Sequence, residues 1–193
     1  MKEKKHISLI ILLISFSLFC SYHIYYYFLD KSNNDLVRNY YDTLSINNDE
    51  PVISKVNNTK KEEYLGILRI PKISLVEGFY NINSKNNNIG KSVMILKESV
   101  MPNNNGSIIY LVAHSGTGYL AYFKNLDKLN IDDIIYLDID NLSYEYVIND
   151  IYEVDRNGLI NINHNINDNY LILSTCSNND KQLVISSKLV NYR

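Results

Sequence analysis

A cysteine and a histidine each end an apolar, β-prone run and are followed at once by a polar turn. Cys176 follows "YLILST" (170–175) and precedes "SNND", and His114 follows "SIIYLVA" (107–113) and precedes Ser-Gly-Thr-Gly. A thiolate is a strong nucleophile, and a nearby cation favours it over the thiol. Because strand ends from distant parts of a chain can meet at one rim of a barrel, these two residues could form a nucleophile and its acid/base partner.

Cys176 has no obvious partner for a disulfide. The other cysteine, Cys20, lies in the apolar N-terminal segment, and structural cysteines outside the cytoplasm usually come in pairs. Three interpretations are therefore open for this thiol, namely an inert buried side chain, an intermolecular link or a nucleophile.

His114 is also ambiguous by itself, because a histidine at a strand end often has a structural role. The other histidines are weaker candidates: His6 and His23 flank the apolar N-terminal segment, and His164 lies in the polar loop "NINHNIND". We expect no metal site, because zinc generally needs several Cys, His or carboxylate ligands and neither Cys-x-x-Cys nor His-x-x-x-His spacing occurs.

The N-terminal segment predicts a membrane anchor. Three lysines within residues 1–6 precede an apolar run and a Tyr-rich border, which together cover residues 7–28. This length suits a spanning helix of roughly 17–25 residues, and the lysines predict a cytoplasmic N-terminus with the rest of the chain outside. A cleaved signal peptide and a buried core helix are the alternatives, but no small-x-small cleavage site follows the run.

The remaining chain divides into a polar stalk (29–62), with helical character around 34–44, and a globular domain (63–193). The chain has 193 residues, of which 46% are hydrophobic, and its net charge of −2 gives no argument for nucleic-acid binding. One segment, 118–129, has helical spacing, whereas short β-prone runs predict a mostly-β barrel or sandwich. These runs are 64–71, 91–96, 107–113, 133–139, 143–154, 170–175 and 182–190.

Four motifs in order resemble those of the sortases, membrane-anchored cysteine transpeptidases of bacterial cell surfaces. They are "YLGILRIPKISL" (64–75), "LVAHSG" (111–116), "AYFKNLDKLNIDDIIYLDID" (121–140) and "LILSTCS" (171–177). The resemblance extends over about residues 63–190 and, with the anchor, fits the family's organisation. The wording "LSTCS" is most similar to the class B type.

The resemblance implies a fold and a reaction. The fold is an eight-stranded sortase-type β-barrel with short helices. In the reaction, a thiol-protease type of chemistry, Cys176 attacks the Thr–Gly carbonyl of a sorting signal similar to Leu-Pro-x-Thr-Gly, and His114 protonates the departing amine. An amine on a peptidoglycan precursor or a pilin then resolves the thioacyl enzyme. No cofactor is expected, although some family members bind calcium.

The sequence departs from the family at one position. Sortases carry an arginine at the start of the strand after the cysteine, whereas no arginine occurs here between Cys176 and Asn191. Lys181 or Gln182 occupies the matching position, and only one of them can face the site because side chains alternate along a strand. We favour Gln182, which directly precedes the apolar strand. The departure leaves two alternatives open: a thiol hydrolase on the same fold, and a non-catalytic or weakly active binding module.

Overall fold

The computed structural model describes residues 2–46, 64–103, 105–156, 160, 165, 167–177 and 180–193. Expectations for most of the stalk (47–62) and for His164 fall outside these residues. The chain forms two compact units, Met1–Asp35 and Leu36–Arg193, which are treated separately below.

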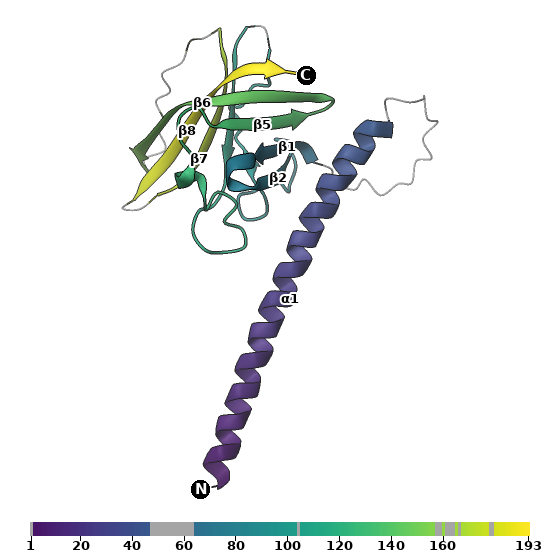
Figure 1. Ribbon diagram of the computed structural model, residues 1–193, viewed down its shortest axis with the longest axis vertical. Helices are drawn as coiled ribbons and strands as arrows, with labels where there is room; N and C mark the ends of the chain where they lie inside the picture. The colour runs from purple at the N-terminus through teal and green to yellow at the C-terminus, as the bar shows by residue number, and fades with distance from the viewer. Residues whose placement is uncertain are drawn as a thin grey trace. The chain divides into compact units, whose positions relative to one another are not determined.

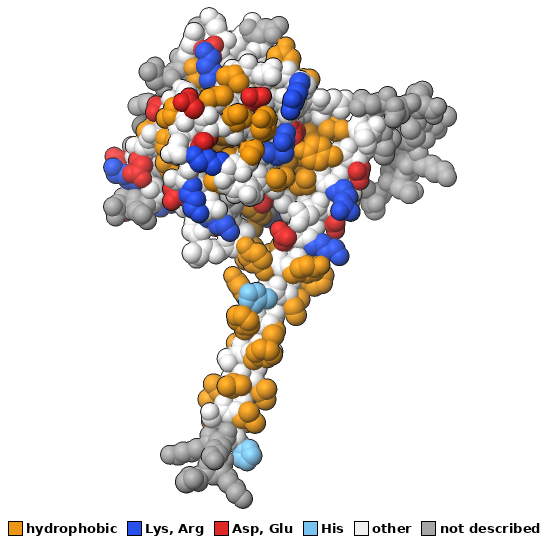
Figure 2. Space-filling model, in the orientation of Figure 1, with side chains coloured by type: hydrophobic (Ala, Val, Ile, Leu, Met, Phe, Trp, Pro, Cys, Tyr) orange, Lys and Arg blue, Asp and Glu red, His pale blue; other side chains and the backbone are white. Residues whose placement is uncertain are grey.

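The first unit is the N-terminal part of helix α1 (Lys2–Ile46), which runs on beyond the unit boundary. Apolar side chains cover this part of the helix, as Figure 2 shows, and those from Ile7 to Phe28 are largely exposed. Its most apolar 18-residue window has a mean hydropathy of 2.1 and is 0% buried. A helix with so much unburied apolar surface is a candidate membrane anchor.

The second unit contains a nearly closed barrel made from a single eight-stranded sheet (Figure 1). The strand order is β2-β1-β5-β6-β8-β7-β4-β3, and a bridge between Phe79 and Val93 joins the two outer strands. The barrel alternative to a sandwich is thus confirmed. The strands are β1 (Tyr64–Ile70), β2 (Leu75–Tyr80), β3 (Met94–Ile95), β4 (Ser107–Val112), β5 (Ile134–Ile139), β6 (Leu142–Asp155), β7 (Asn169–Cys176) and β8 (Lys181–Tyr192).

Alternation along the strands separates two apolar clusters. Leu171 and Leu173 of β7 point into the barrel core, whereas Tyr170 and Ile172 lie on the outer face. On that face they pack with residues of β4, β6 and β8 to form what we call the outer apolar patch. The patch has a buried centre of Tyr170, Ile172 and Val184, against which the partly buried Ile108, Tyr110, Tyr152, Val154 and Ile160 pack.

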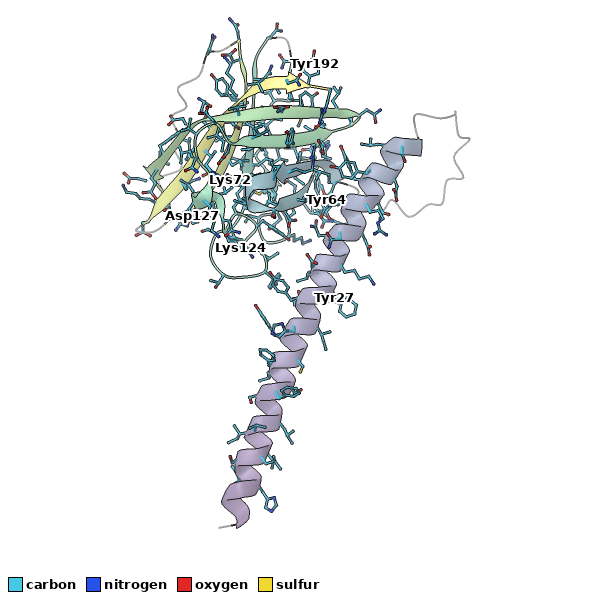
Figure 3. All side chains as sticks on the ribbon, viewed as in Figure 1. Tyr27, Tyr64, Lys72, Lys124, Asp127 and Tyr192 are labelled. Carbon is cyan, nitrogen blue, oxygen red and sulfur yellow. The ribbon has the colours of Figure 1, made fainter. Side chains whose placement is uncertain are left out.

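Two local expectations need correction. The segment 118–129 is a series of turns with one short 3₁₀ helix, η2 (Leu126–Lys128), because its backbone bonds join residues three apart, as from Lys124 N–H to the Ala121 carbonyl (3.1 Å). Its residues Ala121, Phe123, Leu126 and Leu129 are still buried, while Lys124 and Asp127, labelled in Figure 3, are exposed. The run 91–96 contains only the two residues of β3, and β2 was not predicted; a 3₁₀ turn, η1 (Pro71–Ile73), connects β2 to β1.

Candidate active site

Parallel pairing of β4 with β7 brings the two candidate residues to the same end of neighbouring strands. Val112 is in register with Ser174, and the pairing continues because Ala113 N–H donates to the Ser174 carbonyl (3.4 Å). Ala113 and Thr175 are buried, at 1% and 5% exposure, so the next residue on each strand points away from the core. Continued by two residues, this register sets His114 beside Cys176 on the outer face.

Two hydroxyl groups connect these strand ends. Thr175 Oγ1 donates to the Ala113 carbonyl (2.8 Å), and Ser115 Oγ donates to the Cys176 carbonyl (2.6 Å). Both bonds cross from β7 to the chain around His114, so they fix the spacing of the two strand ends. The sequence analysis did not identify these hydroxyls, although Ser115 directly follows His114 and Thr175 directly precedes Cys176.

The chain turns sharply after His114. Gly116 has a φ of +100°, a conformation that side chains disfavour, and an added Cβ would meet nothing within 4 Å. The glycine is therefore required for its backbone conformation and not for space. Phe123 is 1% exposed, and its N–H donates to the His114 carbonyl (3.0 Å), which closes the loop that follows the histidine. The histidine backbone is thus held in place while its imidazole stays exposed.

Neither candidate side chain has a partner among the described residues. Cys176 is a free, half-buried thiol, and His114 is exposed. Within the described part of the chain, the Cys176 thiol and the His114 imidazole have no hydrogen bond or ion pair. Both groups are therefore free to contact a substrate.

The β7–β8 hairpin distinguishes Lys181 from Gln182, the two residues predicted to take the place of the arginine that sortases carry. Ser177 N–H donates to the Lys181 carbonyl (2.8 Å), so Cys176 and Gln182 form the next, non-hydrogen-bonded pair, in which side chains lie close together. Directly paired residues share a face, which puts Gln182 on the face of Cys176. Lys181 lies on the opposite face and is exposed.

Gln182 is hydrogen-bonded to a serine that the sequence analysis missed. Its Nε2 lies 2.6 Å from Ser174 Oγ, and that hydroxyl donates to the Leu183 carbonyl (2.9 Å). Strand alternation from Cys176 would have placed Ser174 on the same face, but its partner depends on the β7–β8 register. Ser177, which follows Cys176, donates its hydroxyl to the Glu153 carboxylate.

The outer apolar patch continues from Cys176 along the same face of β7 and β8. Burial, reinforced by Glu98, raises the pKa of Tyr110, and burial with Asp150 raises that of Tyr152. The two phenols therefore stay neutral at physiological pH. The partly buried residues around the centre of the patch are apolar or aromatic, and such residues next to a thiol suit the apolar side chains of an extended peptide.

Metal-binding groups do not cluster in the part of the chain that the structure describes: no three His, Cys, Asp or Glu side chains there could hold an ion together. The cofactor expectation is not tested by this observation and stays a prediction.

Comparisons with known proteins agree on one family. The model of the Sortase domain matches residues 68–190. No curated protein matches the chain.

Solved structures with the same fold include three from different bacteria. Sortase C of Streptococcus pneumoniae is 18% identical, with a TM-score of 0.60 over 84% of this chain and 92% of that one. The sortase D5 transpeptidase of Clostridium perfringens is 18% identical, with a TM-score of 0.60 over 84% and 98%. A lid mutant of sortase A from Corynebacterium diphtheriae is 18% identical, with a TM-score of 0.61 over 81% and 91%. Identities this low show a shared fold only, so the resemblance of "LSTCS" to class B sortases stays a prediction.

Proposed function

The chain belongs to the sortase family, and from this premise we propose that it is a membrane-anchored cysteine transpeptidase with Cys176 as nucleophile and His114 as general acid. The observation that supports these roles most is the parallel β4–β7 pairing, which brings both residues to one face. Among the described residues neither side chain has a hydrogen-bond partner, and the strand that carries Cys176 also carries the outer apolar patch.

The proposed reaction has two acyl transfers. The Cys176 thiolate attacks the Thr–Gly carbonyl of a sorting signal similar to Leu-Pro-x-Thr-Gly, and the C–N bond breaks as the His114 imidazolium gives its proton to the leaving amine. A thioester on Cys176 results. An incoming amine then attacks this thioester and gives a proton to His114, and the C–S bond breaks to restore the thiolate. The balance requires no cofactor, so we expect EDTA to leave the rate unchanged.

The proposed partners follow from the site and the anchor. The outer apolar patch would accept the apolar part of the signal on a surface protein, and the acceptor would be an amine on a peptidoglycan precursor or a pilin. The apolar segment of α1 would hold the protein in the cell membrane as a single span. The lysines Lys2, Lys4 and Lys5 favour a cytoplasmic N-terminus, which places the catalytic domain outside.

A transfer assay tests this function. The full chain in detergent is incubated with a Leu-Pro-x-Thr-Gly peptide library and an amine acceptor, and the products are identified by mass spectrometry. We expect an amide between the peptide's threonine and the acceptor, formed by the wild type and not by Cys176→Ala. Water as the only acceptor would favour the thiol hydrolase. No cleavage of any peptide in the library would favour the non-catalytic binding module.

A further inference from the structure

Ser174 is a buried residue on the face of β7 that carries Cys176, and its hydroxyl does not belong to the proposed catalytic pair. It is 2% exposed and occupies the position two residues before Cys176, on the same face of β7. Most buried hydroxyls are hydrogen-bonded, and this one has two partners: the Leu183 carbonyl and the Gln182 amide.

The direction of these two bonds fixes the orientation of the Gln182 side chain. A hydroxyl has one proton, and that of Ser174 is donated to the Leu183 carbonyl at 2.9 Å. Its lone pairs can therefore only accept, so the amide group that approaches to 2.6 Å must be the nitrogen, as is found. The amide nitrogen carries a second proton, which has no partner among the described residues.

The residue paired with Cys176 is a neutral glutamine, where the sequence resemblance leads us to expect a cation. Gln182 is the cross-strand neighbour of Cys176, and Lys181 lies on the other face. A neutral amide stabilises a developing oxyanion only through a directed hydrogen bond, whereas a cation also acts through its charge. The orientation of the amide is therefore decisive for this chain.

We propose that Ser174 is a positioning residue, which holds the Gln182 carboxamide beside Cys176 so that its second N–H donates to the substrate's carbonyl oxygen during acyl transfer. The inference rests on the proposed function and assigns Ser174 a role through Gln182 only. Ser174 itself does not contact the reacting atoms.

A double-mutant cycle on the full chain in detergent tests the role. We expect Ser174→Ala and Gln182→Ala each to lower kcat about tenfold with little change in KM. Gln182→Ala removes the N–H that donates in the transition state, and Ser174→Ala removes the hydrogen bond that orients this N–H. The double variant should lose no more than either single variant, because the two residues act as one unit. Ser174→Thr keeps the hydroxyl and should restore most of kcat.

Ser187→Ala is the matched control. Ser187 is also buried, at 0% exposure, and its hydroxyl donates to a backbone carbonyl, that of Leu171 (2.8 Å). It lies on the opposite face of β8 and at a distance along the strand from Cys176. A loss of stability without a catalytic role should therefore appear equally in Ser187→Ala and leave its kcat unchanged.

Three results would overturn the role of Ser174. They are a wild-type kcat in Ser174→Ala, losses that add in the double variant, and an equal loss of kcat in Ser187→Ala. Should Ser174→Ala fail to fold, Gln182→Met tests the same pair from its other side, and an unchanged kcat there also overturns the proposal. These failures leave transfer by the wild type intact, whereas a wild type without Cys176-dependent transfer would overturn the proposed function itself.

Discussion

The polar groups around Asp138 are hydrogen-bonded to one another, whereas the thiol and the imidazole at the Cys176 end of β7 have no partner among the described residues. Asp138, on β5, is 5% exposed and accepts two hydrogen bonds from Arg69, from Nε at 2.7 Å and from Nη2 at 2.9 Å. Ser143 Oγ adds a third (2.6 Å), and the Tyr41 hydroxyl a fourth. The guanidinium also lies over the Tyr136 ring, 4.8 Å from its centroid.

These bonds change the ionisation of the carboxyl group. Burial alone would raise the pKa of Asp138, but the hydrogen bonds from Arg69, Ser143 and Tyr41 outweigh it and hold the pKa below its ordinary value. The same ion pair raises the pKa of Arg69. The Asp138 carboxylate is therefore held in its charged form by groups of its own domain.

The hydrogen bonding of the two regions separates polar groups that stabilise the fold from candidates for a reaction. At Asp138 the carboxylate accepts four hydrogen bonds within the domain, so the cluster stabilises the barrel and the adjacent turns of α1. At Cys176 and His114 the backbone is fixed by Thr175 and Ser115, but the two side chains have no partner in the described residues. We therefore expect substitutions in the first region to change stability and in the second to change activity.

Cys176→Ala should give the largest effect on activity. We expect transfer to fall by at least about 10³-fold, because no other thiol lies in the barrel and no thioester can form. Thermal unfolding should change little, since one half-buried sulfur contributes little packing. Turnover by the Ala variant would show that Cys176 is not the nucleophile.

His114→Gln should lower kcat by about 10²–10³-fold, since the leaving amine would lose its proton donor. The bell-shaped pH–rate profile expected for a thiolate and an imidazolium should lose its alkaline limb. Rates measured from pH 5 to 10 would check this. A wild-type rate and profile would mean that another group, for example His164, is the acid.

Asp138→Ala should act on stability instead. We expect a loss of about 2–3 kcal/mol in the free energy of unfolding, because the variant leaves a partly buried guanidinium unpaired; Arg69 is 33% exposed, which moderates the cost. Chemical denaturation gives the value, and kcat of the folded variant should equal that of the wild type. A selective loss of kcat would mean that the two regions are coupled.

The same carboxyl group predicts a pH dependence. Since the folded-state pKa of Asp138 is lowered, its contribution to stability is complete above the unfolded-state pKa of about 3.9 and is lost as pH falls through the folded-state value. Asp138→Asn should therefore show a weaker loss of stability between about pH 5 and 2 than the wild type. If the stability of the two proteins changed with pH in the same way, Asp138 would not have a lowered pKa in the folded state.

The β7–β8 register predicts different effects for neighbouring residues. Gln182→Ala should lower kcat about tenfold, and Lys181→Ala less than twofold, because only Gln182 shares the face of Cys176. Gln182→Arg, which restores the family's residue type, should keep or raise the rate. The reverse order for the two Ala variants would indicate a register slip by one residue.

Tyr41→Phe should have the smallest effect, about 1 kcal/mol of unfolding free energy, because it removes one of several hydrogen bonds to Asp138. Tyr27→Phe serves as the control, since Tyr27 lies in the first unit and is 64% exposed (Figure 3). Equal stability of the two variants would show that Tyr41 does not stabilise the domain.

Much of the fold could be predicted because strand periodicity is local. Six of the eight strands coincide closely with predicted runs. β2 was missed because "LVEGFY" contains Glu77 and Gly78, which weaken the strand pattern. The reason for Gly78 lies far away in sequence, since a Cβ there would come within 2.1 Å of the Tyr64 ring.

The site could be predicted only as separate residues. Cys176 and His114 stood out by type and position, but their proximity depends on the parallel β4–β7 pairing. The choice of Gln182 over Lys181 depends on the hairpin register, and the contact of Ser174 with Gln182 depends on the same register. The Asp138 cluster joins Arg69, Ser143 and the end of α1. These residues are far apart in the sequence, and their spacing gives no motif from which the cluster could be predicted.

Intact-mass measurement of the full chain after incubation with a sorting-signal peptide, without an acceptor amine, tests the central claim most directly. We predict a wild-type species heavier by the peptide up to its threonine, located on Cys176 by digestion and released by hydroxylamine. Cys176→Ala should show no such species, and His114→Gln should accumulate it far more slowly. An adduct on another residue, or an adduct that persists in Cys176→Ala, would contradict the account.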